Sequence, residues 1–275
     1  MSELDVYPLL KTATVSVTDV RCKGSCKHQS EEECASAVHL VFPYRGVFAR
    51  HVGRRQAIAE ANQVLFFNPD EGYRVSHPVA GGDACLSFAI DEPVLRELTP
   101  KPVREAGSIL KFREQRMRID PRAQALVALL RHGLCKGMAE PLEAESLALT
   151  LVQRALGPRT SHVGGASFGR QRIADRVKLV LASDLGRRWT LAEIAAEVGG
   201  SPVYLTQVFQ QVEGVPLYRY QLRLRLARAL DLLGKYDDIT ALGLDLGFSS
   251  HSHFSALFRQ TYGYSPSKFR QMARL

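Results

Sequence analysis

The 275-residue sequence lacks several features that would fix its class at once. No apolar run approaches the roughly 20 residues of a membrane-spanning helix, so we expect no membrane partner. The N-terminal residues MSELDVYPLLK are acidic and have no long apolar core, which argues against a secretion signal. The sequence has only 5 cysteines, and this odd number favours free thiols in a reducing cytoplasm over a disulfide framework.

Neither sign of charge is in large excess, but the charges are unevenly distributed. The whole chain has a net charge of +8. Residues 170–275 carry 15 Lys and Arg against 9 Asp and Glu, whereas residues 1–169 carry 21 against 19. Because a positive field favours a polyanionic partner, the C-terminal region is the candidate for binding double-stranded DNA.

The N-terminal half shows the period of β-strands. Residues 15–20, 38–42 and 86–90 alternate between apolar and polar, and residues 64–67 form a short apolar run. Glycine, proline and asparagine separate these segments as turns, which predicts an antiparallel barrel or sandwich.

From about residue 107 the period becomes helical, and a segment rich in glycine and serine follows it. The predicted organisation is α+β, with four parts: a β domain over residues 1–106, a helical element over 107–157, a flexible linker over 158–169 and an all-helical basic domain over 170–275.

One helix-turn-helix pattern occurs twice in the basic domain. Apolar residues at i and i+3, a small residue at i+4 and a glycine at i+8 recur about 48 residues apart, as Leu191, Ile194, Ala195 and Gly199 and then as Ile239, Leu242, Gly243 and Gly247. The small residue lets a second helix cross closely, and the glycine permits a tight turn. Each copy continues in an amphipathic helix that ends at a glycine suited to a left-handed cap. Two copies in register predict a DNA-binding domain.

The arginine-rich segment 217–234 between the copies has helical periodicity and no internal proline. A continuous helix there would hold the two units at a fixed separation, so that they could enter successive major grooves on one face of DNA.

These residues resemble the AraC-type transcriptional regulators. The matching stretches are LAEIA (191–195), SPVYL (201–205), RLRLA (223–227), GFSSHSHFS (247–255) and FRQTYGYSP (258–266). The resemblance implies two helix-turn-helix units joined by a long helix, an N-terminal cupin-like sensor barrel and a helical dimerisation element. It further implies a homodimer that is controlled by a small molecule, a metal or thiol redox state, and that contacts RNA polymerase if it is an activator.

Carried over by position, the recognition helices span about 202–212 and 251–261. The candidates for reading bases are the outward side chains Val203, Thr206, Gln207, Gln210, His251, Ser252 and His253. The first helix has no lysine or arginine, so glutamine, which can pair bidentately with adenine, would carry the reading. Family members often have an arginine in place of Gln207 and a larger polar residue in place of Ala256, so the second unit is expected to read few bases.

Phosphate contacts are expected from basic side chains and from the amide groups at helix N-termini. The candidates are Arg170, Arg172, Arg187, Arg188, Ser201, Arg223, Ser250, Arg259, Lys268 and Arg270.

The sensor half contains a cluster of thiols. Cys22, Cys26 and His28, with Cys34 and Cys85 further along, could hold zinc or copper(I) or could sense redox state. The alternative is that these cysteines pack as small apolar side chains. No cofactor other than such an ion is expected.

Two further interpretations of the sensor half are an apolar effector pocket and an oxygenase-type metal site. An apolar effector pocket could be lined by Phe42, Phe48, Leu65, Phe67 and Phe88. The half has no His-x-His pair of the kind that cupin enzymes use to hold a metal, which argues against an oxygenase-type site.

The leading hypothesis is therefore a cytoplasmic, non-enzymatic, sequence-specific transcription regulator. A constitutive DNA-binding protein whose barrel only dimerises is the first alternative. A cupin-type metalloenzyme with a DNA-binding tail is the second.

Overall fold

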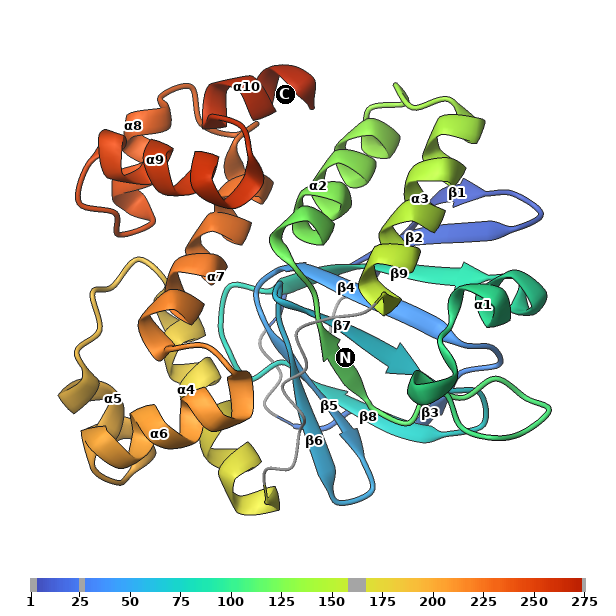
Figure 1. Ribbon diagram of the computed structural model, residues 1–275, viewed down its shortest axis with the longest axis horizontal. Coiled ribbons are helices and arrows are strands. Elements are labelled where there is room, and N and C mark those ends of the chain that lie inside the picture. The colour runs from blue at the N-terminus through green and yellow to red at the C-terminus, as the bar shows by residue number, and fades with distance from the viewer. Residues whose placement is uncertain (1–3, 25–27, 158–166, 274–275) are drawn as a thin grey trace.

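The computed structural model describes residues 4–24, 28–157 and 167–273. A β domain with two covering helices lies beside a helical C-terminal domain (Figure 1), as the sequence predicts. The strands are β1 (Leu4–Lys11), β2 (Val15–Cys22), β3 (Glu33–Cys34), β4 (His39–Arg45), β5 (Phe48–Val52), β6 (Arg55–Ala59), β7 (Gln63–Phe67), β8 (Gly72–Ser76), β9 (Asp83–Ile90) and β10 (Arg116–Arg118).

The described strands form two antiparallel sheets, a six-stranded one in the order β1-β2-β9-β4-β7-β10 and a four-stranded one in the order β3-β8-β5-β6. Strand β4 shows how the sheets are packed. Leu40 and Phe42 belong to the core under the covering helices, whereas Val41 belongs to the core shared with Phe48 of the smaller sheet. Burial on both faces explains why β7 is apolar at successive positions.

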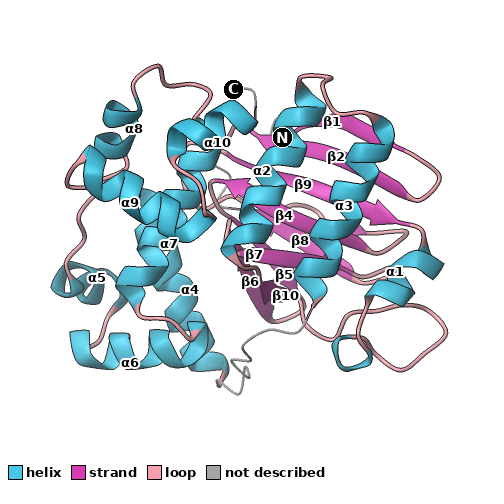
Figure 2. Ribbon diagram, turned by 45° about the horizontal axis from the view of Figure 1, so that its top comes forward, coloured by secondary structure: helices cyan, strands magenta, loops and turns pink. Residues whose placement is uncertain are grey.

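Helices α2 (Pro121–Cys135) and α3 (Pro141–Leu156) lie across one face of the six-stranded sheet (Figure 2). Asp120 begins α2 by accepting a hydrogen bond from the Ala123 amide at 2.8 Å. The predicted helical region therefore starts too early at residue 107, because residues 116–118 form β10 and pair with β7. A three-residue edge strand has no period that the sequence could reveal. The short helix α1 (Glu92–Leu98) and the 3₁₀ turn Lys101–Val103 precede β10.

The C-terminal domain contains two helix-turn-helix units at the two ends of a central helix (Figure 1). Its helices are α4 (Phe168–Ser183), α5 (Leu191–Val198), α6 (Pro202–Glu213), α7 (Leu217–Leu232), α8 (Ile239–Asp245), α9 (His251–Tyr262) and α10 (Pro266–Met272). The helices predicted at 202–212 and 251–261 and the helix that connects the two units are thus confirmed. Residues 158–166 of the predicted linker lie outside the described residues, and α4 begins within its last two positions. None of the described helices is long and apolar enough to cross a bilayer.

Candidate nucleic-acid interface

Unit 1, which we define as α5 and α6, is built from local signals in the sequence. Thr190 and Glu193 form a reciprocal cap: Thr190 Oγ1 accepts from the Glu193 amide at 3.2 Å, and Glu193 accepts from the Thr190 amide at 2.7 Å. Hydrogen bonds to the Glu193 carboxylate from the Thr190 hydroxyl, at 2.7 Å, and from the Thr190 amide, with an ion pair to Arg187, lower the pKa of Glu193 to about 2. Ser201 then begins α6 by accepting from the Tyr204 amide at 3.2 Å. The recognition helix is therefore fixed at its start by its own sequence.

Unit 2, defined as α8 and α9, repeats this construction with different residues. Asp238 begins α8, and Ser250 begins α9 by accepting from the His253 amide at 3.1 Å. The small residue of the pattern, Gly243, faces α9 so closely that a Cβ there would lie 3.1 Å from Phe254. The sequence pattern therefore identified the point where the two helices cross.

The predicted base-reading residues of α6 are on its exposed side. Val203 is 65% exposed, and Gln207 and Gln210 are also exposed. Thr206 is half-buried, and its hydroxyl donates to the Val203 carbonyl at 2.8 Å, within its own helix. The two glutamines are thus the side chains of α6 best placed to reach base edges.

The predicted residues of α9 are less uniform. His251 and Ser252 are exposed, and the two ring nitrogens of His251 lie 3.4 Å from the Thr240 hydroxyl and 3.3 Å from that of Ser255. His253 is half-buried, with its Nδ1 3.0 Å from the Ser249 hydroxyl. These contacts orient both imidazole rings, and their role in base reading stays a prediction.

The phosphate candidates fall into two groups. Six basic residues are exposed, namely Arg170, Arg172, Arg187, Arg188, Arg259 and Lys268. Arg187 is ion-paired with Glu193 at 2.6 Å. Arg270 is half-buried and donates to the carbonyls of Tyr236 and Asp237, so it anchors the loop between α7 and α8. Arg223 is also half-buried. Ser201 and Ser250 use their hydroxyls as helix caps.

One residue that sequence reasoning missed connects the two units. Arg225 on α7 is 4% exposed, and its guanidinium donates to carbonyls of the α4–α5 loop and to the Gly247 carbonyl of unit 2 at 3.0 Å. Two of the loop bonds, to Leu185 and Arg187, measure 2.8 and 2.7 Å. The backbones also touch, because a Cβ on Gly247 would lie 2.1 Å from the Gly186 carbonyl oxygen. Arg225 therefore joins the loop that leads into unit 1 to the turn of unit 2.

Unit 1 is attached to the sensor domain through buried charges. Lys178 of α4 is fully buried, and its Nζ lies 2.6 Å from Glu213 of α6. Across the junction, Arg116 of β10 pairs with Asp175 of α4 at 2.9 Å, and Arg118 lies 3.6 Å from Glu213. The five residues form a continuous network, in which each buried charge has a partner of opposite sign.

A second contact of this junction joins residues far apart in the chain. The Tyr220 hydroxyl of α7 donates to Glu60 of the sensor domain at 2.5 Å. Burial raises the pKa of both groups above their ordinary values. Apolar residues complete the junction, because Leu179 and Ala182 of α4 pack against a core that includes Ile58.

Unit 2 is attached mainly through helix α2. Ala128 of α2 is part of the same apolar core as Leu230, Phe254 and Phe258. Arg131 of α2 pairs with Asp231 of α7 at 2.8 Å, with both side chains at or below 10% exposure. Asp231 is also ion-paired with Arg228.

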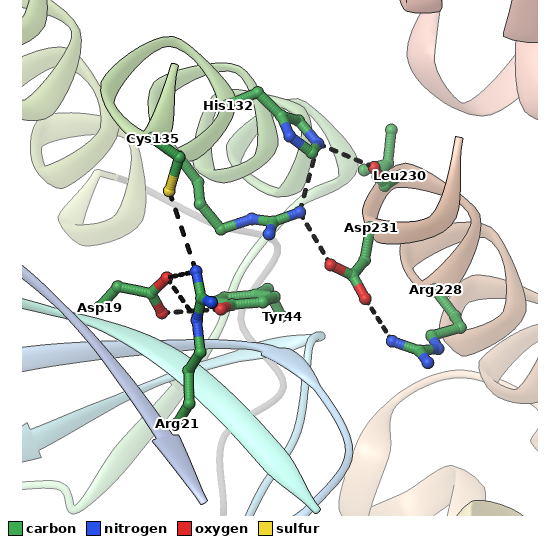
Figure 3. Close-up of polar contacts among 9 residues, drawn as sticks. Asp19, Arg21, Tyr44, His132, Cys135, Arg228, Leu230 and Asp231 are labelled. Atoms are coloured by element: carbon green, nitrogen blue, oxygen red, sulfur yellow. Dashed lines mark hydrogen bonds and ion pairs between the residues drawn. The ribbon is translucent and has the colours of Figure 1, made fainter. Parts of the chain in front are cut away.

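Figure 3 shows the polar part of this second junction. His132 of α2 has its Nε2 3.2 Å from the Leu230 carbonyl oxygen, and burial beside Arg131 lowers the pKa of His132 to about 4. On the sheet below, Tyr44 donates to Asp19 at 2.7 Å, and the Arg131 guanidinium lies 4.2 Å from the centre of the Tyr44 ring. Arg131 therefore contacts both domains.

The thiol candidates are distributed differently from the prediction. Cys34 and His28 are exposed, and Cys26 lies outside the described residues. Cys85 is buried between the sheets, where burial raises the pKa of its thiol far above the ordinary value. Within the described ranges, the cluster of metal-ligand side chains that contains Cys22 is completed by His77 and Asp83. Neither His77 nor Asp83 was among the candidates named from the sequence.

The predicted aromatic pocket is divided between two cores. Phe48, Leu65 and Phe67 lie between the two sheets, whereas Phe42 and Phe88 lie on the opposite face under the covering helices. These five side chains therefore cannot line one effector pocket. The alternation of strand residues explains the division, because residues on successive positions point to opposite faces.

The comparisons with known proteins agree with this architecture. Residues 9–157 match the family model of the AraC-binding-like domain, and residues 194–272 match that of a helix-turn-helix domain. An AraC-binding-like domain joined to a helix-turn-helix domain defines a DNA-binding transcription regulator with an N-terminal ligand-binding domain. The chain belongs to the AraC-type family of these regulators.

Individual relatives cover different shares of the chain. The transcriptional activator RhaR of Klebsiella pneumoniae is 32% identical over 138 residues, which are 50% of this chain and 47% of that protein. The probable regulator LumQ of Photobacterium leiognathi is 25% identical over 232 residues, 81% of this chain and 88% of LumQ. The chain spans less than half the length of RhaR and of the regulatory protein PocR of Salmonella typhimurium.

Two solved structures of regulators also match the chain. An AraC-type regulator from Chromobacterium violaceum is 30% identical with a TM-score of 0.37, covering 39% of this chain and 96% of that one. ToxT from Vibrio cholerae is 12% identical with a TM-score of 0.38, covering 96% of this chain and 99% of that one.

Proposed function

We propose that this chain is a sequence-specific DNA-binding transcription regulator whose sensor domain controls the DNA-binding domain by docking against it. The observation that carries the proposal is the pair of recognition helices, α6 and α9, each begun by a serine cap and each exposing one side at equivalent positions. Such helices enter the major groove with the residues near their N-termini against base edges. The protein would act in the cytoplasm, where DNA is accessible to it.

The spacing of the two units supports binding to one face of DNA. Helix α7 has 16 residues, so it extends about 24 Å, with a recognition helix beyond each end. Successive major grooves on one face are about 34 Å apart. Because Arg225 joins the two units, the domain would arrive at DNA with both helices already placed.

The control step is proposed to use the two junctions. In the docked arrangement, unit 1 is held by the network around Lys178 and unit 2 by α2 and Arg131. An effector that binds better to one arrangement of the domains would shift the population toward it. An activator would in addition contact RNA polymerase.

Homodimerisation is proposed to use α3 and not α2. One face of α2 contributes Ala123 and Val127 to the sensor core, and the other contributes Ala128 to the core of unit 2. Helix α3 instead leaves an outer side exposed, including Leu142 at 75% exposure. A Leu142→Asp variant should then weaken association in sedimentation at matched concentrations.

The test is affinity selection of genomic DNA fragments by the full-length protein. We expect a discrete motif with two half-reads about one helical turn apart. Gln207→Ala should erase one half-read, whereas Gln211→Ala, a change to an exposed neighbour on the same helix, should leave the motif intact. Enrichment without any motif would refute sequence-specific binding. A motif whose occupancy is unaffected by reductant, zinc and copper(I) would direct the search to an organic effector, and one unaffected by any effector would favour constitutive binding.

A further inference from the structure

Three buried side chains of different chemistry converge at one corner of the sensor domain. Cys22 ends β2, Asp83 begins β9, and His77 immediately follows β8. Their exposures are 1%, 5% and 7%, and one ligand atom of each lies within 4.8 Å of the others. The cluster is on the sensor domain and takes no part in the DNA interface described above.

Strand pairing and close backbone contacts fix this corner of the sensor domain. Cys22 and Asp83 are direct cross-strand partners in the β2–β9 pair, so their side chains share one face of the sheet. Gly82 has a φ of +72°, and a Cβ there would lie 2.3 Å from the Cys22 carbonyl oxygen. A Cβ on Gly46 would similarly lie 2.2 Å from the Gly82 carbonyl oxygen. The end of β2, the loop before β9 and the turn at Gly46 are therefore packed as closely as glycine allows, which fixes the backbone positions of Cys22 and Asp83.

We propose that Cys22, His77 and Asp83 bind one divalent zinc ion. Thiolate, imidazole and carboxylate are each ligands that zinc accepts, and three protein ligands leave one tetrahedral position for water or another donor. The charges also balance, because a thiolate and a carboxylate neutralise a divalent cation in a buried site. Copper(I) is disfavoured, since it selects soft sulfur ligands over carboxylate oxygen.

The positions of His77 and Asp83 without metal need to change only slightly to admit zinc. His77 Nδ1 lies 2.5 Å from Asp83 Oδ2, so a proton bridges these atoms. Zinc bonded to both at tetrahedral angles would hold them about 3.4 Å apart. The ion would thus replace the bridging proton, and the two side chains would separate by roughly 1 Å.

The test uses the full-length protein after treatment with a chelator and is read without DNA, so its outcome is independent of the proposed function. Cobalt(II) is the probe, because thiolate ligation gives a charge-transfer absorption in the near ultraviolet. We expect one cobalt per chain, displaced by one zinc. Cys22→Ser should abolish the charge-transfer band, and His77→Gln and Asp83→Asn should each weaken metal binding at least about tenfold.

Matched controls are available in the same domain. Cys34→Ser changes an exposed thiol, Cys85→Ser changes a buried one outside the cluster, and both should keep the band. A band that survives Cys22→Ser and disappears in Cys26→Ser would overturn the assignment, and so would wild-type protein that binds no stoichiometric metal. If Cys22→Ser does not fold, X-ray absorption of zinc-loaded wild type decides: one sulfur ligand is expected, and none or several would refute the site.

Discussion

The two helix-turn-helix units share one local design and differ in how they are attached to the sensor. Both have a polar cap, a turn glycine and a left-handed C-terminal glycine at matching positions. Unit 1 is held by buried ion pairs and a tyrosine–carboxyl hydrogen bond, whereas unit 2 shares an apolar core with α2 and uses Arg131 beside it. The repeated residues thus determine each unit, and the residues that are not repeated determine how it docks.

The largest expected effect comes from the charged junction of unit 1. Lys178→Met removes the fully buried cation 2.6 Å from Glu213 and leaves that carboxylate only the longer contact to Arg118, so the free energy of unfolding should fall by about 3–5 kcal/mol. Urea unfolding of the full chain measures this change. Lys268→Met, at an exposed position, should change stability by less than about 0.5 kcal/mol. Similar values for the two variants would mean that the network is not stabilising.

The junction of unit 2 should respond to acid. The folded-state pKa of His132 is about 4, below the ordinary 6.5, so the unfolded chain takes up a proton first as the pH falls. Above pH 6.5, His132 should therefore contribute no pH dependence. As the pH falls from 6.5 to 4, protonation of His132 in the unfolded chain should lower the free energy of unfolding by on the order of 3 kcal/mol in total. The difference between wild type and His132→Gln isolates this contribution. A difference that is constant with pH would contradict the lowered pKa.

Removing the connection between the two units should lower the free energy of unfolding by less than disrupting either junction. Arg225→Met removes the hydrogen bonds to Gly247 and to the α4–α5 loop, and we expect a loss of about 2 kcal/mol in unfolding free energy. Its affinity for DNA with both half-reads should also fall, while its affinity for a single half-read is retained. Arg219→Met, on the exposed side of α7, is the matched control. Equal losses of affinity for DNA with both half-reads and for DNA with a single half-read would show that Arg225 does not set the spacing of the two units.

The two recognition helices can be compared at one equivalent position. Gln207 and Ala256 each lie six residues after the serine cap, so Gln207→Ala makes unit 1 resemble unit 2. Affinity for the specific site should fall by about 1–3 kcal/mol, with non-specific binding nearly unchanged. Fluorescence anisotropy on both kinds of DNA measures this difference, and equal losses would remove Gln207 from base reading.

The smallest effect is expected from a single phosphate contact in unit 2. Arg259→Ala should weaken binding to all DNA sequences and reduce the slope of log affinity against log salt by about 1. Affinities at several salt concentrations test this expectation. An unchanged slope would exclude Arg259 from the phosphate contacts.

The parts that could be predicted from the sequence depend on neighbours in the chain. Caps such as Ser201 and Ser250 act within three residues, and the glycines act at their own backbone positions, so a fixed spacing reveals them. The Tyr220–Glu60 contact instead joins residues 160 positions apart, and no local pattern marks it. The cluster of Cys22, His77 and Asp83 was missed for the same reason, because strand pairing and a loop bring the three together.

Helix α2 also has a consequence for how the protein unfolds. Its residues complete two cores, one in each domain, so neither core can keep its packing once this helix melts. The sensor domain and the C-terminal domain therefore form one cooperative unit while they are docked. In hydrogen exchange, the amides of α2 should be among the slowest in the molecule, and opening of either domain should be visible in the exchange of the other.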